Sequence, residues 1–248
     1  MKKYVNFIKK LMADKYIRNS TKIPSNAKVI SFTFDDVPES AFNNAQAILD
    51  KNQLQATFYI VLSFLDSNLY NRQQLSSCIS NGHELGCHTY GHIHFYQVSN
   101  TSIIKSEIRK NQTELNKIGI EESFVNFSYP FGEQTIKAKK IVANHFETCR
   151  GTNYGINKGK IDMDNLKAVK LYEKLHSLDT IFSILEEFNK SGGWLIFYTH
   201  DVQTDFSQYG CSPEYFEKII LRCKDLNIDI QTVRDAAKKL GITKHKGH

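Results

Sequence analysis

The sequence predicts an α/β fold in which a parallel sheet curls into a (β/α) barrel of seven or eight units. Short runs of β-branched and aromatic residues alternate with helical segments about every 30 residues, which is typical of right-handed βαβ units. Seven or eight such units indicate a barrel. The 248 residues contain no Pro- or Ser-rich linker, so we expect a single domain over residues 1–248.

The expected elements follow one another along the chain. Strands are expected where β-rich apolar runs are bounded by turn residues, at 28–34, 56–61, 83–87, 124–128, 146–150, 167–172, 194–199 and 228–230. Helices are expected at 40–51, 71–81, 101–118, 134–144, 179–190, 213–225 and 232–240. A loop rich in Gly and Asn is expected at 151–159.

An amphipathic helix is expected at the beginning of the chain, at about residues 1–18. Its apolar residues fall mainly on one side and its basic residues on the other. We expect the helix to pack against the domain. Peripheral contact with an anionic membrane surface is the second interpretation.

Composition argues against several classes of protein. The net charge is +6 and the lysines are mostly scattered, so no nucleic-acid partner is expected. The five cysteines include no C-x-x-C pair, so neither a disulfide framework nor a thiolate zinc site is indicated. No stretch approaches the ~20 apolar residues of a membrane span, and no signal peptide is recognisable. We therefore expect a cytoplasmic protein, with a peripheral membrane location as the second choice.

Two adjacent carboxylates, Asp35 and Asp36, stand at the end of the first expected strand. Chemistry in parallel sheets and barrels collects at the carboxyl ends of strands. Paired acids there can bind a metal or accept a proton. The alternative is a turn that ends the strand and caps the next helix, and this stretch alone favours neither interpretation.

Two histidines four residues apart, His88 and His92, follow the third expected strand. On a helical turn this spacing places both imidazoles on one face, where they can bind a single ion. His94 forms a competing pair with His92, so the motif alone does not identify a metal site.

Two further polar clusters stand at strand ends. Residues 127–132 read Phe-Ser-Tyr-Pro-Phe-Gly, and His200 follows the longest apolar strand. A histidine in this position can serve as a general acid or base, or it can form a hydrogen bond at the edge of a sheet. Four polar clusters at four strand ends favour a functional site.

The motifs T-F-D-D, H-T-x-x-H, Y-P-F-G and T-H-D, in this order over residues 32–201, resemble the polysaccharide deacetylases of carbohydrate esterase family 4. The resemblance implies a distorted (β/α) barrel and hydrolysis of N-acetyl groups from an amino sugar in a polysaccharide or glycan precursor. It also implies one divalent metal ion, usually Zn²⁺, with Co²⁺, Ni²⁺ or Mn²⁺ as alternatives. Two other functions stay open: a deacylase of a non-sugar amide, and a glycan-binding relative without catalysis.

The resemblance also implies a role for each matching residue. The metal would have three protein ligands, Asp36, His88 and His92. Asp35 would be the general base, and His200 would protonate the departing amine. The backbone N–H of Phe131 would bind the oxyanion, with Tyr129 in the same turn contributing to the binding of substrate.

Two positions depart from the family's pattern. The family carries an arginine that pairs with the catalytic aspartate, where this chain has Ser128. It also carries a leucine that lines the acetyl-methyl pocket, where this chain has Tyr198. We expect Arg150, which ends the following strand, to replace the missing arginine by a two-pronged bond to Asp35. A loop cap or a contact with an acidic group of the substrate is the alternative role for Arg150.

Overall fold

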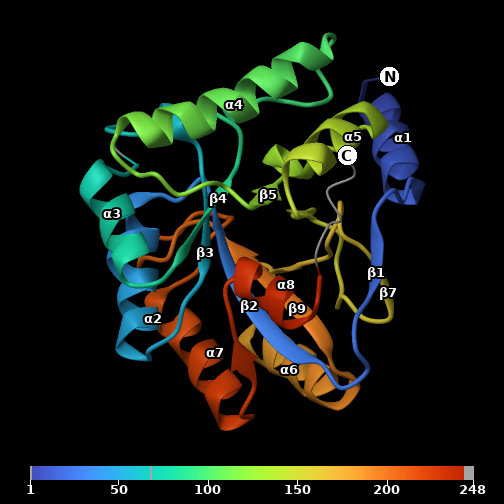
Figure 1. The fold of residues 1–248 in the computed structure, drawn as a ribbon. Coiled ribbons are helices and arrows are strands. Elements are labelled where there is room, and N and C mark those ends of the chain that lie inside the picture. Colours follow the sequence, from blue (N-terminus) through green and yellow to red (C-terminus); the bar gives the residue numbers. More distant parts are fainter. Residues whose placement is uncertain (1, 68, 243–248) are drawn as a thin grey trace.

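The computed structural model describes residues 2–67 and 69–242 and is built around one parallel sheet (Figure 1). The strands lie in the order β6 (Thr148–Arg150), β5 (Asn126–Ser128), β4 (Glu84–Cys87), β3 (Thr57–Ile60), β2 (Lys28–Asp35), β9 (Gly193–Thr199) and β8 (Val169–Lys170). A short strand, β10 (Asp229–Ile230), pairs with the beginning of β2. The central position of β2 places the end of this strand, with Asp35, in the middle of the sheet.

The sheet curls until its two ends meet. Two backbone hydrogen bonds join the chain just before β8 to β6. The Leu166 N–H donates to the Cys149 carbonyl at 2.8 Å, and the Gly151 N–H donates to the Leu166 carbonyl at 2.9 Å. The predicted distorted barrel is therefore confirmed.

Helices cover the outside of the curled sheet (Figure 1). They are the π-helix η1 (Ala41–Gln46) with α2 (Ala47–Lys51), then α3 (Arg72–Ser80), α4 (Thr101–Lys117), α5 (Ile136–His145), α6 (Leu178–Ser191) and α7 (Pro213–Asp225). Alternate residues of β2 point to opposite faces of the sheet, so Phe32 and Phe34 pack outward against the helices. Both rings lie edge-on to Phe216 of α7. This outer layer is the larger of two buried clusters.

The inner face of the sheet has its own core, which the last helix, α8 (Val233–Lys239), covers. Val233, Ala236 and Trp194 are buried in this inner cluster. The backbone N–H of Val233 donates to Thr57 at 2.8 Å, at the beginning of β3. Helix α8 thus fills the barrel near the amino ends of the strands and leaves the carboxyl ends open to a site.

The sequence did not predict a small ribbon and two short helices. Strand β1 (Ser20–Lys22) pairs antiparallel with β7 (Lys160–Asp162), far away in the chain. The 3₁₀ helices η2 (Leu62–Phe64) and η3 (Pro130–Gly132) follow β3 and β5. The elements are only three residues long, so they carry no hydrophobic periodicity.

The amino-terminal helix α1 (Lys2–Lys15) lies beside α5 (Figure 1). The helix packs against the domain, as predicted, but not through its apolar side, because Tyr4 and Phe7 are 68% and 62% exposed. The helix docks through its other side, on which Ala13 is fully buried. Amphipathicity identifies two sides of a helix but does not say which of them the domain covers.

No helix within residues 2–67 and 69–242 has both the length and the apolar character needed to cross a lipid bilayer. The cysteines are reduced and buried in the structure: Cys78, Cys87, Cys149, Cys211 and Cys223. None of them belongs to the group of possible metal ligands within the described residues.

Candidate metal and catalytic site

The candidate site lies at the carboxyl ends of four strands. Asp35 ends β2 and Asp36 follows it, His88 follows β4, Arg150 ends β6 and His200 follows β9. Parallel strands bring their carboxyl ends to one edge, so residues that are far apart in the sequence converge there. The structure thereby brings together the side chains that the strand-end argument selected.

Three of these residues form the geometry of a metal site. One ligand atom each from Asp36, His88 and His92 lies within 4.8 Å of the other two. The Asp36 Oδ1 atom is 3.1 Å from His92 Nε2 and 3.6 Å from His88 Nε2. His94 is not part of this group, because its Nδ1 atom bonds to Glu133 at 3.0 Å.

The backbone around the ligands is strained. Asp36 and His92 have φ angles of 58° and 48°, in the left-handed region that residues other than glycine seldom adopt. Such conformations cost about 1–3 kcal/mol each and collect at functional sites. Here the reversal of the chain after Asp35 lets two consecutive carboxylates occupy one site.

His88 is oriented by a backbone carbonyl. Its Nδ1 atom lies 2.7 Å from the Ser128 carbonyl, which can only accept, so the proton sits on Nδ1 and the Nε2 lone pair is free for a metal. Burial lowers the pKa of His88 to about 4. Burial, together with the neighbouring His88, lowers the pKa of His92 to about 3. Both imidazoles are therefore neutral at pH 7, the form that binds metals.

The surroundings of the Asp36 carboxylate suit a bound cation. Burial and the neighbouring Asp35 carboxylate raise the pKa of Asp36 to about 7. Its buried Oδ1 atom has no hydrogen-bond partner among the residues that the structure describes. A divalent cation would supply both the missing partner and the missing positive charge. One carboxylate and two imidazoles, with room for further ligands, suit Zn²⁺ and similar ions.

Arg150 contacts the neighbouring carboxylate, Asp35. Its Nη2 atom donates to both carboxylate oxygens, while Nη1 donates to the Gly151 carbonyl at 2.9 Å. One nitrogen thus makes both contacts of the expected two-pronged bond. Burial raises the pKa of Asp35, but Arg150 and then His88 and His200 oppose it and lower that pKa to about 2. Asp35 is therefore ionised at neutral pH.

Aromatic rings and a hydroxyl surround the Arg150 guanidinium. Its Cζ atom lies 4.7 Å from the ring centre of Tyr198 and 5.4 Å from that of Tyr59. Its Nη2 atom also donates to the Ser128 hydroxyl, which in turn donates to Asp35 at 3.3 Å. Cation–π contact and burial hold the guanidinium in place. Tyr198 therefore lies against Arg150, two residues before His200.

The turn after β5 places the side chain of Phe131 at the surface and that of Tyr129 in the core. Phe131 has a φ of 57° and is 53% exposed, with its ring stacked on His94 at 3.8 Å between centres. Tyr129 is buried, and its hydroxyl donates to the Asp164 carbonyl at 3.0 Å. The side chain of Tyr129 packs in the outer core, so the prediction that it contributes to binding substrate is wrong for the side chain.

His200 lies beside Asp36 in the site. Its Nε2 atom is 4.0 Å from Asp36 Oδ2, and its ring is flanked by Tyr172 and Tyr209 at 5.9 and 5.5 Å between centres. The Nδ1 atom is buried and has no hydrogen-bond partner within residues 2–67 and 69–242. Burial lowers the pKa of His200, and Asp35 acts in the opposite direction. The carboxylate of the neighbouring Asp201 accepts hydrogen bonds from the backbone N–H and the hydroxyl of Ser207.

Sequence reasoning missed several groups around the site. Ser128 supplies both the carbonyl that orients His88 and a hydroxyl near Asp35. Glu133, directly after the Y-P-F-G motif, binds His94 and the backbone of the loop that carries the histidines. The only signal for Glu133 was its position beside a motif. The aromatic pair Tyr172 and Tyr209 had no recognisable pattern.

Comparison with known proteins agrees with this architecture. A model of the polysaccharide deacetylase family matches residues 22–146, half of the chain. The chain is 30% identical over 115 residues to a bifunctional xylanase/deacetylase of Pseudobutyrivibrio xylanivorans, covering 45% of this chain and 18% of the relative. It is 32% identical over 87 residues to a peptidoglycan-N-acetylglucosamine deacetylase of Bacillus cereus, covering 35% of this chain and 38% of the relative. The chain thus spans less than half the length of these curated relatives.

Solved structures share the fold. A carbohydrate esterase domain of a multidomain xylanase from the hindgut metagenome of Trinervitermes trinervoides superposes with a TM-score of 0.60 at 18% identity, over 87% of this chain and 92% of that one. A family 4 carbohydrate esterase from Streptomyces lividans superposes with a TM-score of 0.59 at 17% identity, over 84% of this chain and 93% of that one. A family 4 pseudoenzyme from Bacillus anthracis superposes with a TM-score of 0.62 at 14% identity, over 86% of this chain and 66% of that one. With the family model matched over half of its length, the chain belongs to the polysaccharide deacetylase family.

Proposed function

We propose that this chain is a metal-dependent hydrolase that removes N-acetyl groups from an amino sugar in a polysaccharide or glycan precursor. The observation that carries the proposal is the group Asp36, His88 and His92, whose ligand atoms lie within 4.8 Å of one another beside an ionised Asp35. Membership of the polysaccharide deacetylase family supports an N-acetylated sugar as the substrate.

The proposed ligands are Asp36, His88 and His92, and Zn²⁺ is the proposed ion, with Co²⁺, Ni²⁺ and Mn²⁺ as alternatives. When bound, such an ion supplies Lewis acidity and lowers the pKa of a water from ~15.7 toward ~7. The protein contributes neutral imidazoles and a carboxylate already gathered at one point. Bringing these ligands together in advance removes part of the entropic cost of binding.

Asp35 is proposed as the general base. Its carboxylate would accept a proton from the water whose oxygen adds to the acetamide carbon. Arg150 keeps the carboxylate ionised and fixes its orientation, and the Ser128 hydroxyl adds a second contact. The backbone N–H of Phe131 is proposed to donate to the oxyanion that forms in this addition.

His200 is proposed as the general acid. The C–N bond breaks when the amine nitrogen receives a proton, because an unprotonated amine is a poor leaving group. The Nε2 atom of His200 lies 4.0 Å from Asp36 Oδ2, so its ring could reach a leaving nitrogen beside the proposed metal ligands. A positioned acid of this kind contributes ~10²–10⁴ in rate.

Acetate release tests the proposal. Protein loaded with Zn²⁺ is incubated with an N-acetylglucosamine oligomer and, separately, with a simple acetylated amine, and free acetate is measured. We expect acetate from the oligomer and none from Asp35→Asn protein with the same metal content. Release from the simple amine alone would point to a non-sugar amide as substrate. A metal-loaded protein that binds the oligomer without cleaving it would be a glycan-binding relative.

A further inference from the structure

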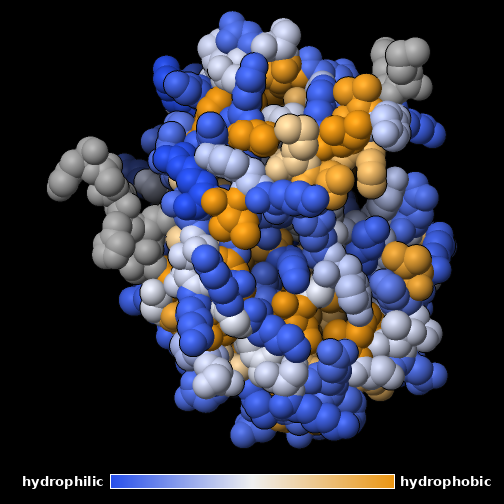
Figure 2. Space-filling view, turned by 90° about the vertical axis from the view of Figure 1, so that its right-hand side faces the viewer, coloured by the Kyte–Doolittle hydropathy of each residue, from blue (hydrophilic) through white to orange (hydrophobic). Residues whose placement is uncertain are grey.

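One side of α1 exposes a continuous row of apolar side chains. We call it the α1 apolar face, and its members are at least 37% exposed: Tyr4, Val5, Phe7, Ile8, Leu11 and Met12. Figure 2 shows orange side chains gathered in the upper part of this side of the molecule. Scattered exposed apolar residues need no explanation, but a contiguous set on one helix marks an interaction surface.

Hydrogen bonds on the opposite side of α1 keep this face exposed. The ammonium of Lys139 on α5 is fully buried and donates to the Ala13 and Tyr16 carbonyls, at 3.1 and 2.7 Å, at the end of α1. Asp14 accepts a hydrogen bond from Asn165 at 2.9 Å. Rotating the apolar side inward would break these buried bonds, so the exposure of the face is built into the docking of the helix.

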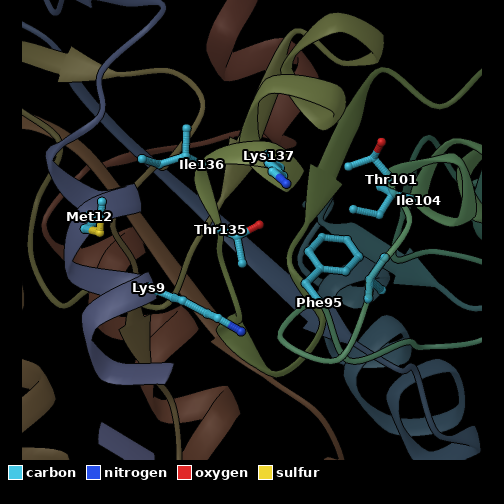
Figure 3. Close-up of a pocket in the computed structure, with 9 residues that line it drawn as sticks. Lys9, Met12, Phe95, Thr101, Ile104, Thr135, Ile136 and Lys137 are labelled. Carbon is cyan, nitrogen blue, oxygen red and sulfur yellow. The ribbon is translucent and has the colours of Figure 1, made fainter. Parts of the chain in front are cut away.

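The apolar face continues into a hollow of ≈ 340 Å³ between α1, α5 and the beginning of α4 (Figure 3). Its lining includes Met12 of the α1 apolar face, Ile136 of α5, Phe95 and Ile104. The hollow has the size of a small-ligand pocket and a largely apolar lining. Since Met12 belongs to both features, the face and the hollow form one surface.

Cations surround this surface. Lys3 and Lys15 of α1 and Lys137 and Lys140 of α5 are exposed, and Lys137 also lines the hollow. Helix α5 contains no acidic residue, and Asp14, the acid in α1, is engaged by asparagine side chains. An apolar strip with a basic border is complementary to a surface that is apolar below and anionic above.

We propose that the α1 apolar face and the adjoining hollow dock onto an anionic lipid bilayer. The apolar side chains enter the boundary between headgroups and acyl chains, the hollow takes the end of an acyl chain, and the lysines contact anionic headgroups. Phe95 follows His92 by three residues in one loop, and Thr135, which also lines the hollow, follows the Phe131 turn. The docked bilayer therefore lies beside the loops of the candidate site. The proposal is independent of the reaction proposed above.

Co-sedimentation of the full chain with vesicles tests the proposal. One set of vesicles contains phosphatidylcholine alone, and the other also contains phosphatidylglycerol. We expect the protein to sediment with the anionic vesicles, to stay in solution with the neutral ones, and to dissociate as salt is raised, because exposed charges are screened.

Matched variants identify the surface. Phe7→Gln with Leu11→Gln is expected to weaken binding to anionic vesicles at least about tenfold, through the loss of apolar burial. Leu221→Gln on α7, which is 45% exposed, is the control and keeps full binding. Lys137→Gln and Lys140→Gln are expected to weaken binding about fivefold each. The control for charge is Lys190→Gln on α6.

Two results would overturn the proposal. The first is that the protein sediments equally with both kinds of vesicle, or with neither kind. The second is a concentration-dependent dimer in analytical ultracentrifugation that the double glutamine variant dissociates, which would identify a second copy of the chain as the partner. Circular dichroism melting of each variant confirms that a loss of binding does not reflect unfolding.

Discussion

Arg150 and Ser128 are register partners on the neighbouring parallel strands β6 and β5, and both side chains reach the carboxylate of Asp35. The resemblance placed the family's arginine at the position of Ser128. In this chain the guanidinium comes from the adjacent strand and bonds directly to the same carboxylate, and the serine hydroxyl contacts both groups. The charge beside Asp35 is therefore retained although its position in the sequence differs.

Arg150→Lys tests whether this charge supports catalysis. Arg150 lowers the pKa of Asp35, so a weaker contact raises that pKa, and the base becomes protonated at higher pH. We expect the acid limb of the pH–rate profile to move upward by about one unit. We also expect the rate to fall about 10- to 100-fold with every substrate, because the carboxylate is less well oriented. Metal content, measured by plasma mass spectrometry, should not change.

Exchanging the two register partners is the stronger test. Ser128→Arg combined with Arg150→Ser returns the guanidinium to the β5 position, from which Asp35 remains within reach. We expect the double variant to recover part of the rate that Arg150→Ser loses and to shift the acid limb back downward. If the double variant is folded and no better than Arg150→Ser, the charge at Asp35 is not what Arg150 contributes.

Metal binding should depend on the proposed ligands and not on the neighbouring His94. His88→Gln and Asp36→Asn are expected to lower the affinity for Zn²⁺ at least about 100-fold, because each removes a proposed ligand. His94→Gln is the matched control and should bind normally, since His94 pairs with Glu133. Titration calorimetry measures the affinities. A His94→Gln protein that loses the ion would move the site to the competing His92 and His94 pair.

His200→Gln should keep the metal and lose turnover. We expect kcat to fall by about 10²–10⁴ without a change in the affinity for Zn²⁺. A general acid is active only when protonated, so in the parent protein the rate falls as pH rises through the pKa of His200. That basic limb should disappear in the variant. Tyr209→Phe keeps the adjoining ring and serves as the control, and an unchanged basic limb in His200→Gln would assign the acid to another group.

The sequence predicted the larger elements well because their signals are local. The strand expected at 194–199 is β9 (Gly193–Thr199), and the helix expected at 101–118 is α4 (Thr101–Lys117). The ribbon of β1 and β7 was missed because each strand has three residues and its partner is far away in the chain. Nothing in either segment alone indicates the pairing.

The candidate site was predictable to the extent that it depends on strand ends. Parallel topology brings Asp35, His88 and Arg150 to one edge whatever their separation in the sequence. The direction of each side chain depends on turn dihedrals and neighbours, so the burial of Tyr129 was not foreseen. The Ser128 carbonyl that orients His88 is a backbone group, which no residue pattern identifies.

The ammonium of Lys139 anchors the end of α1. Lys139 is fully buried, and its ammonium bonds to Asp162 as well as to the carbonyls at the end of α1. Lys139→Met removes this charge and leaves a mostly buried carboxylate and two carbonyls without their donor. We expect the free energy of unfolding in urea to fall by about 3–5 kcal/mol. Lys137→Met, two residues earlier on the exposed side of α5, is the control and should change it by less than about 0.5 kcal/mol.

Truncation distinguishes the anchor from the exposed face. Removing residues 1–11 takes away mostly exposed side chains and should cost little stability, whereas removing residues 1–18 also takes away the carbonyls that Lys139 binds. The longer deletion should therefore be destabilised more than the shorter one, because the Lys139 ammonium loses two of its hydrogen-bond partners and keeps only Asp162. Equal losses from the two truncations would mean that α1 is held by its apolar residues. That outcome would contradict the docking of α1 through Lys139.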